Sequence, residues 1–171
     1  MQTIWITGGS SGIGFATAKE FLSNGWQVVI SSSNKEKLNN AKTRFGEHKN
    51  IDFLHTVVCD ISKQENVNDT ISYIESNIGK INTALLNASA YSPNKDQIFD
   101  IENYELLVDV NIKGTLYCIN KLKDFMKGRN NTIAIISSPL GYRGWPTAGA
   151  YGISKAAQLS LSESLYFDFK K

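Results

Sequence analysis

Short runs of β-branched and other apolar residues alternate along the chain with longer amphipathic stretches. The short runs predict five strands, over Gln2–Thr7, Gln27–Ser31, Asp52–Cys59, Ile81–Asn87 and Thr132–Ser138. The longer stretches predict five helices, at about Ile13–Asn24, Asn34–Phe45, Ser62–Ile78, Tyr104–Met126 and Ala150–Phe169. Such alternation predicts βαβ units and a mostly parallel, doubly wound α/β sheet with right-handed crossovers.

Local signals mark the ends of several predicted helices. Gly25 suits the stop of the first helix, and Asn34 suits the N-cap of the second. Ser62 is predicted to cap the third helix, with Glu65 as its capping-box partner. A polar loop over Ser92–Asp100 precedes the fourth helix. We find no internal repeat or linker, so we expect a single domain over residues 1–171.

Composition excludes several classes of function. The chain is 42% hydrophobic and 20% charged, and its net charge of +2 with scattered lysines argues against a nucleic-acid partner. No run approaches the ~18 apolar residues of a membrane span. Cys59 and Cys118 predict buried free thiols, and His48 and His55 lack metal-ligand spacing. The N-terminal segment has no signal-peptide pattern, so we expect a cytoplasmic protein without a metal.

The segment Thr7–Gly14 (TGGSSGIG) follows the first predicted strand and opens the first predicted helix. Glycines permit a tight turn and let the backbone approach a pyrophosphate, while the helix N-terminus offers free N–H groups. Taken alone, such a turn is equally typical of an ordinary strand-to-helix connection. Its place after the first strand of an alternating βα pattern favours a dinucleotide-binding site.

A second group of residues lies near the last two predicted elements. Tyr151 and Lys155 are four residues apart near the start of the last helix, so they share a helix face. An ammonium beside a phenol favours the phenolate, although this pair alone is also typical of helix surfaces. Ser138 ends the fifth predicted strand. Because ligands bind beyond the carboxyl ends of parallel strands, we expect Ser138 at the rim of the glycine turn, within reach of Tyr151.

Together these residues resemble the short-chain dehydrogenase/reductase family over essentially the whole chain, since TGGSSGIG is similar to its TGxxxGxG cofactor turn. The resemblance implies a Rossmann sheet of order 3-2-1-4-5 and an oxidoreductase that transfers hydride between NAD(P)(H) and a small carbonyl or alcohol substrate. It assigns catalysis to Asn111, Ser138, Tyr151 and Lys155. Besides Tyr151 and Lys155, it assigns cofactor binding to Gly8, Ser10, Ser11, Gly12, Ile13, Gly14, Ser32, Ser33, Asp60, Ile61, Asn87 and Ala88.

The resemblance also implies a role for each catalytic position. Tyr151 would be the general acid in reduction and the base in oxidation, and Ser138 would orient the carbonyl. Lys155 would favour the phenolate and hold the nicotinamide ribose. Asn111 would support the lysine and hold a water that links it to solvent, and Asp60 would contact the adenine. Three loop aromatics are candidates for the substrate pocket, with loop packing as an equal alternative: Tyr91, Tyr142 and Trp145.

Three departures from the family pattern bear on these expectations. Leu86–Ser89 (LNAS) stands where the family has NNAG, which affects packing near the adenine ribose. The second strand ends in Ser31–Ser33 rather than an aspartate, with Lys35 and Lys37 just beyond, so we expect NADP(H) to be favoured over NAD(H). The chain stops after the sixth helix of the family, so we expect its last two strands to be absent and the domain to be truncated.

The early stop leaves several readings open. The chain could be a working enzyme, a catalytically weak or inactive dinucleotide-binding protein, or a fragment of a longer protein. We expect little turnover from the 171-residue form itself. An apolar edge at Thr132–Ser138 would invite pairing with another chain. Tyr104–Met126 and Ala150–Phe169 correspond to the main dimer surface of the family, so we expect a homodimer or homotetramer.

Overall fold

The structure is a computed structural model that describes residues 1–93 and 100–169. Within these residues, one five-stranded parallel sheet has the order β3-β2-β1-β4-β5, which confirms the predicted topology. Most of the loop expected over Ser92–Asp100 lies outside the described residues. The strands are β1 (Thr3–Thr7), β2 (Gln27–Ser32), β3 (Leu54–Val58), β4 (Ile81–Leu86) and β5 (Thr132–Ile135).

Helices connect the strands in the predicted order. They are α1 (Gly12–Ser23), α2 (Lys35–Phe45), α3 (Gln64–Tyr73), α4 (Ile101–Leu107), α5 (Gly114–Met126) and α6 (Gly149–Asp168). Two wider π-helical segments continue them: η2 (Ile74–Ile78) extends α3, and η3 (Val108–Lys113) joins α4 to α5. The short 3-10 turns are η1 (Ile51–Phe53), before β3, and η4 (Pro139–Gly141), after β5.

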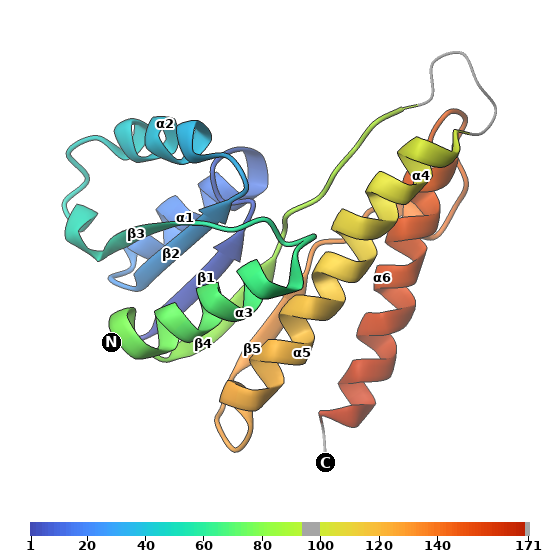
Figure 1. Ribbon diagram of the computed structural model, residues 1–171. Helices are drawn as coiled ribbons and strands as arrows, with labels where there is room; N and C mark the ends of the chain where they lie inside the picture. The colour runs from blue at the N-terminus through green and yellow to red at the C-terminus, as the bar shows by residue number, and fades with distance from the viewer. Residues whose placement is uncertain (94–99, 170–171) are drawn as a thin grey trace.

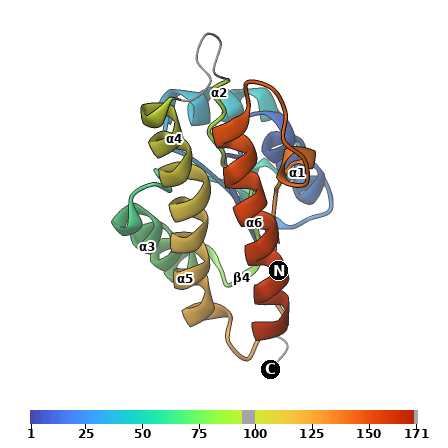
Figure 2. The same ribbon diagram turned by 90° about the vertical axis from the view of Figure 1, so that its right-hand side faces the viewer.

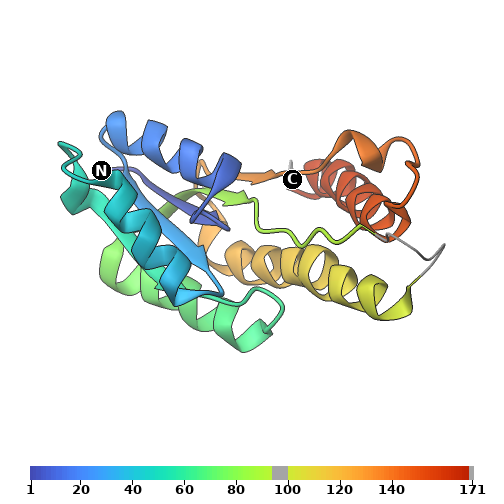
Figure 3. The ribbon, with the colours of Figure 1, turned by 90° about the horizontal axis from the view of Figure 1, so that it is seen from above.

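The helices cover both faces of the sheet (Figures 1 and 3). Ile4 and Ile6 of β1 pack with α1 and α2 on one face, whereas Trp5 packs with α3 and α5 on the other. All five residues of β1 are buried because this middle strand is covered on both faces. At the β5 edge, α6 lies beside the continuous rod of α4, η3 and α5 (Figures 1 and 2).

The strand register brings the carboxyl ends of three strands to one edge of the sheet. Thr7 of β1 is opposite Ser31 of β2, and Ile6 is opposite Leu85 of β4. The glycine turn and the segment after β4 therefore leave the sheet side by side, which is the arrangement that a dinucleotide site requires. No helix in the described part of the chain is long and apolar enough to cross a membrane.

The prediction that Ser62 caps the third helix is wrong. The N-cap of α3 is Lys63, and no side chain among the described residues caps this helix. Ser62 donates instead to Asp60 Oδ1, from its backbone N at 3.0 Å and its Oγ at 2.7 Å. A carboxylate two residues away is the stronger local partner, so the capping box with Glu65 does not form.

Other predicted helix ends are confirmed or shifted. Asn34 caps α2 as predicted, because its Oδ1 accepts from the backbone N of Lys37 at 2.9 Å. Gly25 follows the end of α1 with a φ of +76°. The long helix begins earlier than the predicted Tyr104, since Asp100 accepts hydrogen bonds from the first turn of α4. The last residue of the predicted polar loop, Asp100, is therefore the N-cap of this helix, which the sequence pattern did not predict.

Candidate active site

The glycine turn between β1 and α1 is packed too tightly for side chains at two positions. A Cβ atom on Gly8 would lie 2.8 Å from the Cα of Ala88. One on Gly14 would lie 2.6 Å from the Gly8 carbonyl oxygen. Gly8 also has a φ of +65°, which L side chains rarely adopt. The turn therefore lies directly against the segment that follows β4.

The N-terminus of α1 is open to a ligand. Its N-cap, Ser11, makes no side-chain hydrogen bond to the described helix, and the first turn has no acidic residue. Ser11 and Ile13 are exposed, and a Cβ on Gly12 would meet open space, whereas Ser10 is buried. Uncapped N–H groups beside a tight glycine turn suit a phosphate or pyrophosphate group.

Asn87 and Ala88 join the end of β4 to the end of β1. The backbone N atoms of both residues donate to Thr7 Oγ1, at 2.9 and 3.0 Å. The Asn87 Nδ2 atom donates to the carbonyl oxygens of Thr7 and Gly8, both at 3.1 Å. These bonds hold the glycine turn in place. Asn87 and Ala88, the two residues of the LNAS segment that match the family pattern, therefore stabilise the turn.

The serines at the end of β2 differ in how accessible their hydroxyl groups are to a ligand. Ser31 is buried, and its Oγ accepts from the Trp5 indole nitrogen at 3.1 Å. Ser32 is half-buried, with its Oγ accepting from the backbone N of Asn34 at 3.3 Å, and Ser33 is exposed. The two positions predicted to contact the cofactor are thus those that remain accessible.

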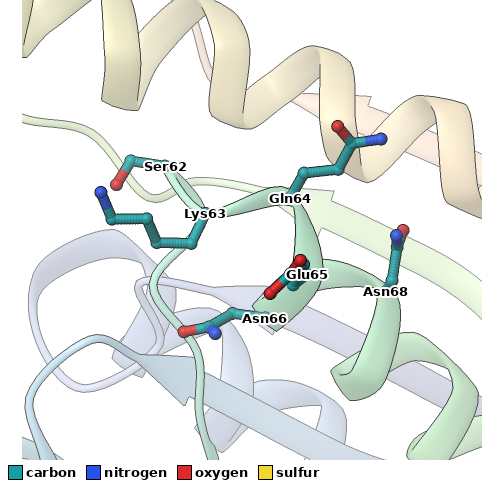
Figure 4. A pocket seen from close by; sticks show the side chains of 6 residues that line it. All are labelled: Ser62, Lys63, Gln64, Glu65, Asn66 and Asn68. Atoms are coloured by element: carbon teal, nitrogen blue, oxygen red, sulfur yellow. The ribbon is translucent and has the colours of Figure 1, made fainter.

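Asp60 and Ile61 lie between β3 and α3. The Asp60 carboxylate is half-buried and is already bonded to Ser62. Ile61 is buried, and its side chain would lie 2.8 Å from a Cβ on Gly114, so it belongs to the packing of α5. A polar hollow beside these residues at the start of α3 is lined by Ser62, Lys63, Gln64, Glu65, Asn66 and Asn68 (Figure 4).

Tyr151 and Lys155 share a face of α6, as their spacing predicts. The Lys155 Nζ lies 5.4 Å from the centroid of the Tyr151 ring. On another side, the Tyr91 ring meets the Tyr151 ring edge-on, with centroids 4.8 Å apart and planes at 74°. Tyr142 and Trp145 are 80% and 68% exposed. Of the three candidate pocket aromatics, Tyr91 is the one with a ring contact to Tyr151 in the described part of the chain.

Ser138 lies on the turn that packs against α6. Strand β5 ends at Ile135, earlier than predicted, and Ser138 is the N-cap of η4, where its Oγ accepts from the backbone N of Leu140 at 3.2 Å. The neighbouring Ser137 donates from its Oγ to the Lys155 carbonyl oxygen at 2.9 Å. The turn that carries Ser138 is thereby tied to the helix that carries Tyr151 and Lys155.

Lys155 is a buried cation, with 1% of the residue exposed. Its Nζ donates to the Ile136 carbonyl oxygen at 2.9 Å and to the Gln158 Oε1 at 3.0 Å. Burial lowers the pKa of the Lys155 ammonium from 10.5 to about 8. An ammonium has three donor hydrogens, so one is left for a further partner.

Asn111 is fully buried in η3 and ties the loop after β4 to α6. Its Oδ1 accepts from the Ala90 N at 2.8 Å and the Ser89 Oγ at 3.1 Å. Its Nδ2 donates to the Ala90 carbonyl oxygen and to the Ser154 Oγ, both at 3.0 Å. Its link to Lys155 runs through a residue that the motif comparison missed, Gln158, whose Nε2 donates to the Asn111 carbonyl oxygen at 2.9 Å.

A sequence signal for these supporting residues existed. Gln158 follows Lys155 by three positions and Thr115 follows Asn111 by four, which places each pair on one helix face.

Two further predictions concern the cysteines: Cys59 and Cys118 are free and buried, as expected, and burial raises the pKa of both thiols. Among the described residues, no cluster of three or more His, Cys, Asp or Glu side chains could hold a metal ion.

Comparison with known proteins gives a consistent picture. The family model described as short chain dehydrogenase matches residues 2–171. An uncharacterized oxidoreductase of Staphylococcus epidermidis is 28% identical over 161 residues, which cover 94% of this chain and 68% of the relative. One from Staphylococcus saprophyticus is 29% identical over 167 residues, which cover 97% of this chain and 71% of that one.

Solved structures share the fold. ElxO with NADP bound superposes with a TM-score of 0.92 and 27% identity, covering 99% of this chain and 68% of its own. The 3-ketoacyl-(acyl-carrier-protein) reductase from Brucella melitensis, complexed with NADH, superposes with a TM-score of 0.88 and 26% identity, covering 99% and 70%.

Proposed function

Because the chain belongs to the short-chain dehydrogenase family and is therefore an oxidoreductase, we propose that it reduces a carbonyl substrate, or oxidises the matching alcohol, with a nicotinamide dinucleotide. The observation that carries the proposal is the buried Lys155 ammonium over the Tyr151 ring, on a helix tied to the turn after β5. A bound nicotinamide would supply or accept the hydride. Residues 1–171 would form one dinucleotide-binding and catalytic domain.

The dinucleotide would lie across the carboxyl edge of the sheet. The open N-terminus of α1 and the crowded turn at Gly8 and Gly14 fit a pyrophosphate held by backbone N–H groups. Asn87 and Ala88 would border the adenine ribose, and Asp60 would contact the adenine. The remaining positions that we propose for this site are Ser10, Ser11, Gly12, Ile13, Ser32, Ser33, Ile61, Tyr151 and Lys155.

The residues of α6 and η4 would handle the proton. Tyr151 would give its phenolic proton to the substrate oxygen in reduction and take it back in oxidation. Lys155 would stabilise the phenolate, and its remaining N–H would bind the nicotinamide ribose. The Ser138 hydroxyl would donate to the same substrate oxygen and orient it. Asn111 would keep the loop after β4 and Ser154 in position through its bonds to both.

Substitution of Tyr151 tests this mechanism. Tyr151→Phe keeps the ring that contacts Tyr91 and removes the proton donor, so reductase activity should be lost while dinucleotide binding stays nearly unchanged. Lys155→Ala should weaken both, because a ribose contact is lost as well. Tyr73→Phe, at an exposed tyrosine at the end of α3, is the matched control. Retention of most of the wild-type kcat in Tyr151→Phe would refute the mechanism.

A dinucleotide-binding protein with little or no turnover is the alternative. A panel of aldehydes and ketones, assayed for oxidation of NADPH and NADH, separates the two readings when dinucleotide binding is measured on the same sample. Tight binding without carbonyl-dependent oxidation would support the alternative. Oxidation that disappears in Tyr151→Phe would support the enzyme.

We further propose that NADP(H) is favoured over NAD(H). Ser32 and Ser33 at the end of β2 and the exposed Lys35 and Lys37 in the first turn of α2 offer hydroxyl and ammonium groups to a 2′-phosphate. An aspartate there would repel that phosphate. Titration with both cofactors tests this, and Ser33→Asp should shift the preference towards NAD(H). Tighter binding of NAD(H) to the wild type would contradict the proposal.

Assembly and location complete the proposal. We expect a homodimer or homotetramer through the α4–α5 rod and α6, which expose apolar residues such as Leu106, Leu116 and Phe167. We propose a cytoplasmic location, supported by the two free, buried cysteines, which suit a reducing compartment. Cell fractionation would test the location.

A further inference from the structure

Gln158 is a buried polar residue of α6 to which the motifs assign no role. Only 2% of it is exposed. Its Oε1 accepts from the Lys155 Nζ at 3.0 Å, and its Nε2 donates to the Asn111 carbonyl oxygen and to the Thr115 Oγ1, both at 2.9 Å. One side-chain amide thus connects the lysine of α6 to the rod of α4, η3 and α5.

Chemistry fixes the direction of this amide. The Asn111 carbonyl oxygen can only accept a hydrogen bond, so it must face the Nε2 of Gln158. The Lys155 ammonium can only donate, so it must face the Oε1. A flipped amide would set a donor against a donor and an acceptor against an acceptor. Gln158 therefore always presents a carbonyl oxygen to the lysine.

The wide turn η3 supplies the anchor for this amide. Besides the Gln158 amide, the Asn111 carbonyl oxygen accepts from the Thr115 Oγ1 at 2.7 Å. A π turn replaces the regular hydrogen-bond ladder of an α-helix, and such turns are frequent at functional sites. The amide is therefore anchored on the Asn111 backbone of η3 and on the Thr115 side chain of α5, rather than on α6 alone.

We propose that Gln158 is a positioning residue, which holds the Lys155 ammonium at the Tyr151 ring; this inference rests on the proposed function. The Gln158 Oε1 and the Ile136 carbonyl oxygen take two of the three ammonium hydrogens. The third then points to a defined place, available to the phenol or the ribose. Without Gln158, the four-carbon side chain has one described acceptor left and is free to turn.

Gln158 does this without adding charge. Tyr151 is the ionisable side chain that faces the Lys155 ammonium in the described structure. On the elements packed against α6, Asp109 and Lys113 of η3 are paired with each other at 2.7 Å and about half exposed, and Glu105 of α4 is exposed. A neutral acceptor stabilises the cation less than burial destabilises it, whereas a carboxylate at the same place would hold the proton on the lysine.

Two substitutions that should shift the pKa of Lys155 in opposite directions test the proposal without any need for turnover. Gln158→Met keeps the length and removes the acceptor, so the pKa of Lys155 should fall by about one pH unit. Gln158→Glu keeps the acceptor and adds a charge, so the pKa of Lys155 should rise by about one pH unit or more. NMR titration of isotope-labelled lysine side chains in the unliganded full chain measures both. Ser160→Met, at an exposed position of α6, is the control.

Dinucleotide binding provides the second measurement. Loss of one hydrogen bond to the ammonium should raise the Kd for the dinucleotide about three- to tenfold in Gln158→Met. Circular dichroism shows whether each variant folds. If Gln158→Met does not fold, the rise of the Lys155 pKa expected in Gln158→Glu tests the proposal alone. A Lys155 titration that stays within about 0.3 pH units of the wild type in folded variants would overturn the proposal.

These outcomes are distinct from failure of the proposed function. If the Lys155 titration moves in opposite directions in the two variants but no carbonyl compound is reduced, Gln158 positions the lysine and the enzyme assignment fails. If reduction occurs and the Lys155 titration does not respond, the enzyme assignment stands and the positioning role fails.

Discussion

Burial of Lys155 makes the stability of this protein depend on pH in a way that a single substitution reveals. The pKa of its ammonium falls from 10.5 to about 8 because of burial. Between these values the unfolded chain still carries the proton and the folded chain has released it. The unfolded state therefore binds more protons, and the free energy of unfolding contributed by this group rises with pH.

The size of the effect follows from the same pKa. Each pH unit between the two values is worth about 1.4 kcal/mol, which gives roughly 2–3 kcal/mol between about pH 7 and pH 10. Lys155→Met removes the titration. It also leaves the Ile136 carbonyl oxygen and the Gln158 Oε1 without their donor, but that cost does not change with pH. The wild type should thus gain roughly 2–3 kcal/mol over the variant across this range.

Urea unfolding at several pH values measures this difference. Ionisable groups away from Lys155 are common to both proteins and cancel in the comparison. Repeating the comparison in a Tyr151→Phe background removes the contribution of the phenol beside the ammonium, and Lys123→Met, at an exposed position of α5, controls for the loss of a surface charge. A difference between wild type and Lys155→Met that stays constant within about 0.5 kcal/mol from pH 7 to pH 10 would refute the reasoning.

Three further predictions concern the glycine turn, the α2 cap and the oligomeric state. Gly14→Ala should weaken dinucleotide binding at least about tenfold, because its methyl group would lie 2.6 Å from the Gly8 carbonyl oxygen; an unchanged Kd in a folded variant contradicts this. Asn34→Ala should lower the free energy of unfolding by about 1 kcal/mol through loss of the α2 cap, measured in urea; a loss below about 0.3 kcal/mol would mean that the cap is not needed. Light scattering should show a homo-oligomer, and a well-behaved monomer would disprove that expectation.

The fold was accessible from the sequence because its signals are local. Alternating apolar runs predicted all five strands, and the family resemblance predicted their order. The N-cap of Asn34 and the stop at Gly25 were visible as single residues. Ser62 was mispredicted because capping rules consider the helix alone. They do not include a competing carboxylate two residues earlier, on Asp60.

The candidate site could be predicted from the sequence only in part. The glycine turn, Tyr151, Lys155 and Ser138 could be found from motif spacing, and the structure places the lysine at the tyrosine ring. The support of Lys155 was visible in the sequence only as the spacing of Gln158 on the same helix face, because the amide is anchored on the Asn111 carbonyl oxygen from another helix. Contacts between elements far apart in the chain leave no periodic signal.

The wide turn η3 also sets the phase of the long helical rod. Asn103, Leu107, Asn111 and Thr115 are all buried, so inward positions recur every four residues here. In a regular α-helix of 3.6 residues per turn, that spacing would drift by about 40° at each step. The wide turn absorbs the drift and keeps both halves of the rod facing inward.

A deletion of one residue within Val108–Lys113 would therefore be a small change for the residues that follow. With regular winding restored, the steps left between Asn103 and Thr115 would turn the helix by about 1,100°, which is within about 20° of three full turns, so Thr115 and Cys118 would still face the interior. A one-residue gap at this point in a comparison of related chains is equivalent to replacing the wide turn by a regular one, and the inward positions after it keep their phase.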